Sequence, residues 1–113
     1  MTDDALGLVA ARFKALGDPA RLKLLSLLME GEQGVGALVE SSGLEQPVVS
    51  RHLAVLRREG VVIRRADGNR GYYRIGDTSI AQICELVCGG VADRLAGHLN
   101  ALPGPDYWAG MGI

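Results

Sequence analysis

The chain has 113 residues, 48% of them hydrophobic, and a formal net charge of −1 at pH 7. Such a chain fits one domain with a modest core, which buries roughly 60–70% of the unfolded surface. No apolar run approaches the ~20 residues that span a membrane, and no basic segment behind Met1 leads into an apolar one. We therefore expect a cytoplasmic protein without a membrane partner, in which Cys84 and Cys88 are reduced thiols.

Apolar residues at helical spacing predict two helices at the start of the chain. Residues 5–16 form the first, through Leu8, Val9, Phe13 and Leu16. Asp18-Pro19 supplies an N-cap and a first-turn proline for the second, which ends before Gly31. We expect the first helix to pack at a dimer interface and the second to form the core.

A short helix, a tight turn and another helix are predicted next. The short helix carries Val35, Leu38 and Val39 and ends at Ser41-Ser42-Gly43, and the following helix begins near Glu45-Gln46-Pro47. In that second helix an inward apolar stripe is predicted at spacing i, i+4, i+7, consisting of Val49, Leu53 and Leu56. The outward side is predicted to carry Gln46, Ser50, Arg51 and His52. This order is typical of a helix-turn-helix whose second helix enters the DNA major groove.

A β-hairpin is predicted directly after this helix. Residues 61–65 and 72–75 are rich in β-formers and flank a turn over 66–71 that contains Asp67-Gly68. The sequence therefore predicts a mainly α fold with a small hairpin, a winged helix-turn-helix. Residues 51–74 contain seven arginines and two acidic residues, a local charge of +5 that leaves −6 for the remainder. The positive charge falls on the predicted DNA face.

A last, long helix is predicted to begin after the cap residue Asp77 and to end at Pro103-Gly104-Pro105. Its apolar stripe comprises Ile80, Cys84, Val87, Val91, Leu95 and Leu102. We expect one domain over residues 1–103 and a flexible tail over 104–113, with docking of Tyr107 and Trp108 on the body as the alternative.

Three segments together resemble the ArsR (arsenic-repressor) family of small bacterial winged-helix regulators. They are residues 13–22, 46–57 and 72–75, and the resemblance runs from about Phe13 to the end of the last helix. It implies a homodimer formed through the first and last helices, and repression of its own operon that an inducer releases. A two-fold dimer would bind double-stranded DNA at an imperfect inverted repeat with half-sites about one helical turn, or a small multiple, apart.

The expected contacts follow from side-chain chemistry. Gln46 and Arg51 can pair bidentately with adenine and guanine edges. Ser50 and His52 can bond a base or a phosphate, although a structural role serves His52 equally well, and Val48 either touches a thymine methyl or packs in the helix. The wing arginines suit phosphate or minor-groove contacts. The candidate DNA-binding residues are Gln46, Val48, Ser50, Arg51, His52, Arg57, Arg64, Arg65 and Arg70.

The family's known sensor patterns are mostly missing from this chain. The arsenic pattern of two cysteines falls on Gly34-Val35-Gly36, and the zinc-type positions fall on Asp77, Ser79, Gly90 and Asp93, where both imidazoles are lost. Ser26 replaces the first cysteine of the persulfide pattern. These three sites are not expected here.

Cys84 and Cys88 remain, one turn apart on the last helix. They could bind a thiophilic ion such as arsenite, antimonite, cadmium or mercury as an inducer, or form an intersubunit disulfide in response to an oxidant. The alternative is plain packing, because free cysteine is a good small core residue. No cofactor is required in either case.

Two other classes of function fit the sequence less well. Winged helices also serve as protein-interaction or dimerisation modules, but the arginine-rich wing and the polar side of residues 46–52 disfavour this. An enzyme is not expected, since the sequence indicates no nucleophile and base pair and no phosphate-cradling glycine motif.

Overall fold

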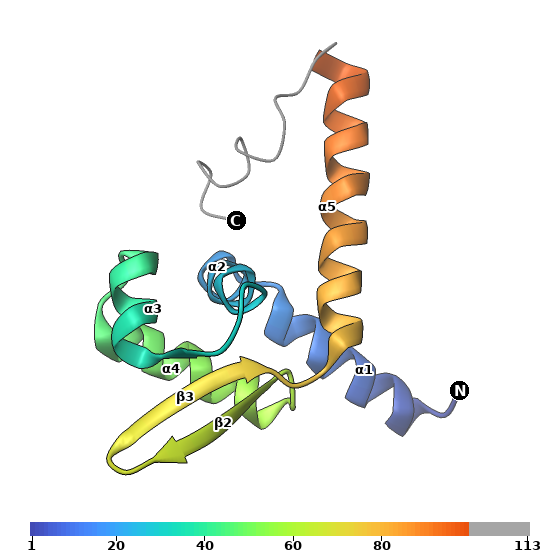
Figure 1. Cartoon of the computed structure of the whole chain (residues 1–113). Helices are drawn as coiled ribbons and strands as arrows, with labels where there is room; N and C mark the ends of the chain where they lie inside the picture. The colour runs from blue at the N-terminus through green and yellow to red at the C-terminus, as the bar shows by residue number, and fades with distance from the viewer. Residues whose placement is uncertain (100–113) are drawn as a thin grey trace.

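The computed structural model describes residues 1–99, with side chains through residue 97. This part of the chain forms five helices and three strands: α1 (Asp3–Leu16), α2 (Pro19–Leu28), β1 (Gln33–Gly34), α3 (Val35–Ser42), α4 (Gln46–Arg58), β2 (Val62–Asp67), β3 (Arg70–Ile75) and α5 (Thr78–Leu99). The predicted winged helix-turn-helix is confirmed (Figure 1). The expected domain end at 103 and the tail 104–113, with Tyr107 and Trp108, lie outside the described residues.

Local chemistry sets the helix boundaries. The Asp18 carboxylate accepts hydrogen bonds from the backbone N–H groups of Ala20 and Arg21, at 2.9 and 3.1 Å, and so caps α2 as predicted. Helix α3 ends at Gly43, whose φ of 73° is the left-handed conformation that glycine adopts without strain. Glu45 precedes α4 without making a side-chain cap bond, so Pro47 in the first turn marks its start.

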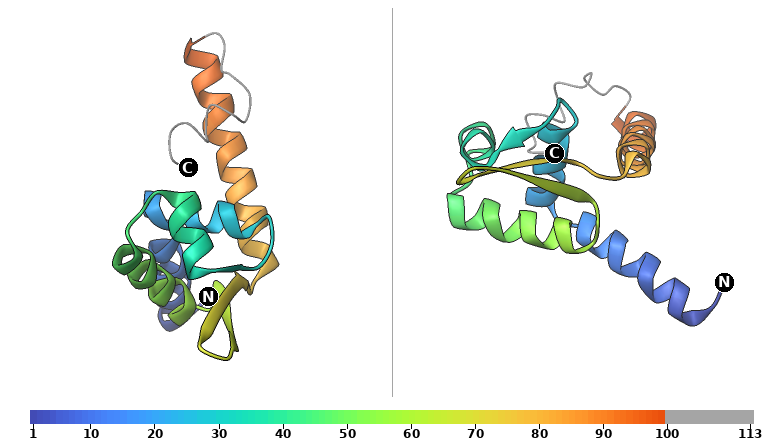
Figure 2. Two further views of the ribbon diagram at one scale, coloured as in Figure 1. Left: turned by 60° about the vertical axis from the view of Figure 1, so that its left-hand side comes forward. Right: turned by 60° about the horizontal axis from the view of Figure 1, so that its bottom comes forward.

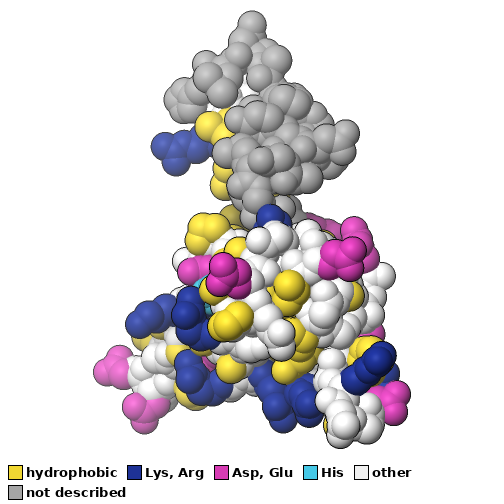
Figure 3. Space-filling model, turned by 90° about the vertical axis from the view of Figure 1, so that its left-hand side faces the viewer, with side chains coloured by type: hydrophobic (Ala, Val, Ile, Leu, Met, Phe, Trp, Pro, Cys, Tyr) yellow, Lys and Arg dark blue, Asp and Glu magenta, His cyan; other side chains and the backbone are white. Residues whose placement is uncertain are grey.

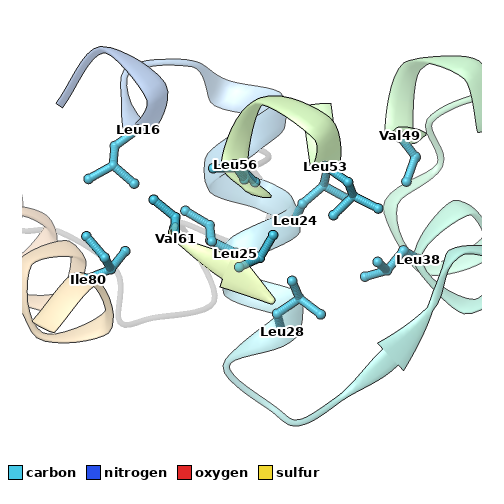
Figure 4. Packing of buried hydrophobic residues seen from close by; sticks show 11 residues of the cluster. Leu16, Leu24, Leu25, Leu28, Leu38, Val49, Leu53, Leu56, Val61 and Ile80 are labelled. Atoms are coloured by element: carbon cyan, nitrogen blue, oxygen red, sulfur yellow. The ribbon is translucent and has the colours of Figure 1, made fainter. Parts of the chain in front are cut away.

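The core lies between α2 and α4. Val49, Leu53 and Leu56 have no exposed surface, which confirms the inward stripe of α4. Figure 4 shows these side chains facing the leucines of α2, with Leu38 at one end of the cluster and Ile80 at the other. Each buried leucine contributes roughly 1.5–3 kcal/mol relative to an exposed one. This packing fixes which side of α4 faces outward.

The sheet is antiparallel and has the order β1-β3-β2. Strands β2 and β3 pair from Val62↔Ile75 to Asp67↔Arg70, so the turn contains only Gly68 and Asn69 and is shorter than predicted. The positive φ of Gly68, 61°, suits such a two-residue turn. Strand β1 was not predicted, because two residues carry no periodicity. It pairs with Tyr72 and Tyr73 and thereby joins the α2–α3 connection to the wing.

Helices α1 and α5 project from the body that α2, α3, α4 and the hairpin form (Figures 1 and 2). Both present large apolar side chains at the surface: Leu6, Leu8, Val9 and Phe13 on α1, and Leu86, Val87 and Val91 on α5. Patches of this kind mark interaction surfaces. Within residues 1–99, no helix combines the length and the hydropathy needed to cross a membrane.

Candidate nucleic-acid interface

Helix α4 carries a continuous exposed side, here termed the α4 outer face, which lies opposite its buried stripe. It comprises Gln46, Pro47, Ser50, Arg51, Ala54, Arg57 and Arg58, all exposed. Sequence reasoning found Gln46, Ser50, Arg51 and Arg57 but missed Pro47, Ala54 and Arg58, although Ala54 follows Ser50 by one helical turn and Arg58 follows Ala54 by another. The outer face thus combines amide, hydroxyl, guanidinium and methyl groups, which can match the patterns of base edges.

Two predicted contact residues lie beside this face and not on it. Val48 and His52 are half-buried. The Nδ1 atom of His52 lies 3.3 Å from Nη1 of Arg21, whose Nε donates a 2.6 Å hydrogen bond to the carbonyl of Ala15. Because guanidinium is only a donor, Nδ1 accepts. His52 flanks the buried stripe, next to Leu53, and joins α4 to α2, which is the structural role expected as its alternative. Its contact with DNA stays a prediction.

The wing brings two arginines next to the start of α4. Arg64 lies across Gly71, where an added Cβ would come within 2.6 Å of its Nε. Arg64, Arg70 and Gln46 line a hollow of about 550 Å³ together with the first turn of α3, whose cap residue Gly34 makes no side-chain bond. Sequence reasoning missed this meeting of α3, α4 and the wing, because the residues lie far apart in the chain.

Arg65 lies differently from Arg64, since neighbouring strand residues point to opposite faces. Its Nη2 forms a 2.7 Å ion pair with Oε1 of Glu32, and its guanidinium stacks 4.8 Å from the Tyr72 ring centroid. The hydrogen bond from Arg65 lowers the pKa of the Glu32 carboxyl, and the same bond raises the pKa of Arg65. Arg64 and Arg65 therefore differ in their surroundings, because Arg65 already has a carboxylate partner; contact of either residue with DNA stays a prediction.

Positive charge is concentrated on the side of the molecule that carries α3 and α4. Figure 3 views the side that carries α3 and α4, and Lys and Arg side chains gather along its lower part. Arg51, Arg57, Arg58, Arg64 and Arg70 are exposed, and no ion pair involves them within residues 1–97. Their charges are available to an anionic partner.

Arg12 connects the α4 end of this surface to the projecting helices. Its guanidinium donates to Oδ2 of Asp77 at 2.8 Å and to the carbonyl of Glu59 at 2.7 Å, joining α1, the end of α4 and the start of α5. The Asp77 carboxylate also accepts from the backbone N–H of Ser79, as expected of a cap. Hydrogen bonds from the Ser79 hydroxyl and N–H lower the pKa of Asp77.

Cys84 and Cys88 are half-buried on α5 and line an apolar groove of about 440 Å³ between α1, α2 and α5. The other walls include Phe13, Leu22 and Met29. Burial, with a smaller effect of the adjacent Cys88, raises the pKa of the Cys84 thiol. No group of three or more potential metal-ligating side chains occurs within the described part of one chain.

Comparison with known proteins identifies the family. The model described as "Bacterial regulatory protein, arsR family" matches residues 18–64. An HTH-type transcriptional regulator of Mycobacterium tuberculosis, Rv0081, is 47% identical over 94 residues, covering 79% of this chain and 82% of the relative. This chain belongs to the ArsR family. A probable mercury resistance operon repressor of Streptomyces lividans is 42% identical over 84 residues, covering 74% of this chain and 67% of that relative.

Solved structures agree with this assignment. The crystal structure of M. tuberculosis Rv0081 has a TM-score of 0.78 at 38% identity, covering 87% of this chain and 99% of that one. The solution structure of a homodimeric winged helix-turn-helix DNA-binding domain from Mycobacterium bovis has a TM-score of 0.77 at 34% identity, covering 87% and 94%. The ArsR resemblance is confirmed, and these relatives are transcriptional regulators and not enzymes.

Proposed function

We propose that this ArsR-family chain is a homodimeric transcriptional repressor that binds double-stranded DNA through the α4 outer face and the wing. One observation carries the proposal. An exposed polar and basic helix face, held in place by the buried Leu53 and Leu56, lies beside a hollow lined by Arg64 and Arg70. A rigid reading helix and a flanking cationic wing are the two parts that base readout and phosphate contact require.

Each side chain has a role within this arrangement. Gln46 and Arg51 read adenine and guanine edges, and Ala54 meets a thymine methyl. Arg64 and Arg70, with the first turn of α3, hold the adjacent phosphate backbone, as does Arg57 at the end of α4. Ser50 bonds a base or a phosphate. Arg65 contributes less because it is paired with Glu32.

Dimerisation supplies the second reading helix. The apolar side chains exposed on α1 and α5 give two copies a surface to bury, and the M. bovis relative is described as homodimeric. A two-fold dimer matches an imperfect inverted repeat with half-sites about 34–36 Å apart or a multiple of that distance.

Fluorescence anisotropy with the DNA upstream of the chain's own gene tests the proposal. The reduced protein is expected to bind that DNA more tightly than a scrambled duplex, and its affinity is expected to fall steeply with salt because bound counterions are released. A chain that binds neither duplex in a salt-dependent manner is an interaction module and not a repressor.

The regulatory signal is proposed to act at Cys84 and Cys88. Support comes from the exposure of both thiols to one groove and from the similarity to a protein named for mercury resistance. Arsenite, antimonite, cadmium or mercury bound there would release the DNA. Release from the wild type but not from the Cys84→Ser/Cys88→Ser variant would establish this sensor. Tight binding that no addition changes would make the cysteines packing residues of a ligand-independent regulator.

A further inference from the structure

We propose that Arg12 is a positioning residue for DNA binding. It fixes the α4 reading helix relative to the dimerising helices α1 and α5, and it thereby determines the half-site spacing that the dimer prefers. This role rests on the homodimeric repressor proposed above and adds the residue that sets the geometry of its operator. Three features of the structure support it: the direction of the Arg12 bonds, the anchoring of their acceptors and the length of α4.

The guanidinium of Arg12 joins α1 to the ends of two other helices. Its Nη1 donates a 2.8 Å hydrogen bond to Oδ2 of Asp77, which precedes α5, and its Nη2 donates a 2.7 Å bond to the carbonyl of Glu59, which follows α4. Because a guanidinium is planar and its N–H directions are fixed, the two bonds determine both the distance and the angle between their acceptors. A rotation of α4 relative to α5 therefore breaks at least one of them.

Both acceptors are themselves held in place. The other carboxylate oxygen of Asp77, Oδ1, accepts hydrogen bonds from the backbone N–H and the hydroxyl of Ser79, at 3.0 and 2.6 Å. Glu59 is the C-cap of α4, where a helix leaves carbonyls without partners, and its own N–H bonds carbonyls of the preceding turn. Gly60 follows with a φ of 73°, and an added Cβ there would lie 3.3 Å from Nη2 of Arg12. Arg12 therefore connects two fixed ends of regular structure.

Apolar packing also joins these helices, but it constrains the angle between them less. Leu16 of α1 and Ile80 of α5 lie in the core cluster near Val61, just beyond the end of α4 (Figure 4). Such contacts depend on the buried area and have no preferred direction, so they permit small rotations. Among the side chains of residues 1–97, only that of Arg12 hydrogen-bonds both the end of α4 and the start of α5.

The link acts at one end of α4, far from the residues that read bases. Figure 2 shows α1 leading away from the C-terminal end of α4, whereas Gln46 lies at the other end of its 13 residues, about 20 Å away at 1.5 Å per residue. A rotation of about 10° at the Arg12 end moves Gln46 by about 3.5 Å, close to the ~3.4 Å rise of one base pair. Each subunit has one such link, so loss of Arg12 loosens the spacing between the two reading helices.

Two substitutions remove the link and are expected to leave the fold intact. The side chains of Arg12 and Asp77 keep 41% and 30% of their surface exposed, and ion pairs at such positions contribute little to stability. Arg12→Met retains an apolar stem and removes both bonds. Asp77→Asn retains an accepting oxygen for Ser79, and asparagine caps a helix as well as aspartate does, but its amide turns a donor toward the guanidinium.

Fluorescence anisotropy of the reduced protein measures the spacing preference, which a loss of stability alone would not change. The probes are the DNA upstream of the chain's own gene and the same duplex with one base pair inserted or deleted between the half-sites. The wild type is expected to lose affinity about tenfold or more on the altered duplexes, because one base pair shifts a half-site by ~3.4 Å and rotates it by about 34–36°. Arg12→Met and Asp77→Asn are expected to reduce this loss at least about threefold. Lys14→Met is the matched control: it removes an exposed positive charge from α1 that has no ion pair within residues 1–97, and it is expected to keep the full loss.

Two results would overturn the positioning role. One is an unchanged spacing preference in both variants, which would leave the repressor proposal standing. The other is dissociation of both variants, seen by sedimentation at concentrations where the wild type is dimeric, which would make Arg12 a dimerisation residue. The repressor proposal itself fails if the wild type binds none of the duplexes in a salt-dependent manner, and the role of Arg12 then falls with it.

Discussion

Arg51→Ala is expected to remove sequence specificity while leaving the fold intact. Arg51 is exposed in the middle of the α4 outer face, and within the described residues it makes no ion pair. The change therefore breaks no internal salt bridge, and surface substitutions of this kind alter stability by about 0.5 kcal/mol or less. Its effect falls on the DNA contact.

The magnitude follows from the contact proposed. A bidentate arginine–guanine pair discriminates by roughly 1–3 kcal/mol, which corresponds to about 5- to 150-fold in affinity. On scrambled DNA, Arg51 contributes only its charge, so a much smaller loss is expected there. The ratio of the affinity for operator DNA to the affinity for scrambled DNA should therefore fall by nearly the whole of this 5- to 150-fold loss.

Fluorescence anisotropy at one fixed salt concentration measures both affinities, and thermal unfolding checks the fold. Arg65→Ala is the matched control, because Arg65 is also an exposed arginine but is paired with Glu32. It is expected to reduce both affinities slightly. Equal losses on operator and scrambled DNA for Arg51→Ala would refute its role as a base-reading residue.

Three further predictions concern the wing, the support of α4 and the cap of α2. Arg64→Ala or Arg70→Ala should weaken binding to both duplexes alike and lower the salt slope by about 1, and an unchanged slope would exclude a phosphate contact. Leu53→Ala should lower the free energy of unfolding by about 2–5 kcal/mol in urea titration, because the side chain is fully buried; a loss below about 1 kcal/mol would contradict the packing described. Asp18→Ala should cost about 0.5–2 kcal/mol through the lost cap. Hydrogen bonds from the backbone N–H groups of Arg21 and Ala20 hold the pKa of Asp18 below its ordinary 3.8. The stability that the ionised Asp18 contributes is therefore fully present above that pH and is lost as the pH falls through the lower folded-state pKa. Asp18→Asn, which retains the cap, should remove this acid dependence, and an unaltered dependence would exclude Asp18 as its source.

The sequence predicts correctly those parts of the structure that depend on the spacing of residues within one helix or hairpin. The periodicity of Val49, Leu53 and Leu56 gave the buried side of α4, and Asp18-Pro19 gave the start of α2, because both are consequences of helix geometry within a few residues. The hairpin was found for the same reason. The turn predicted over residues 66–71 is too long, because the pairing of the two strands extends to Asp67 and Arg70.

The missed features depend on residues distant in sequence. The ion pair between Arg65 and Glu32 spans 33 positions, and the bond between His52 and Arg21 spans 31. Strand β1 exists only through its pairing with β3. Sequence spacing placed Cys84 and Cys88 on one face of a helix but carried no information about the apolar groove that α1 and α2 complete.

Hydroxyl-radical footprinting on the DNA upstream of the chain's own gene tests the central claim most directly. A dimer reading DNA with two α4 helices is expected to protect two patches related by an inverted repeat, with centres about 10–10.5 base pairs apart or a small multiple of that spacing. At a protein concentration that only just saturates the wild type, Arg51→Ala should weaken both patches together. Protection of a single half-site, or no protection at concentrations that saturate the wild-type dimer, would contradict the account.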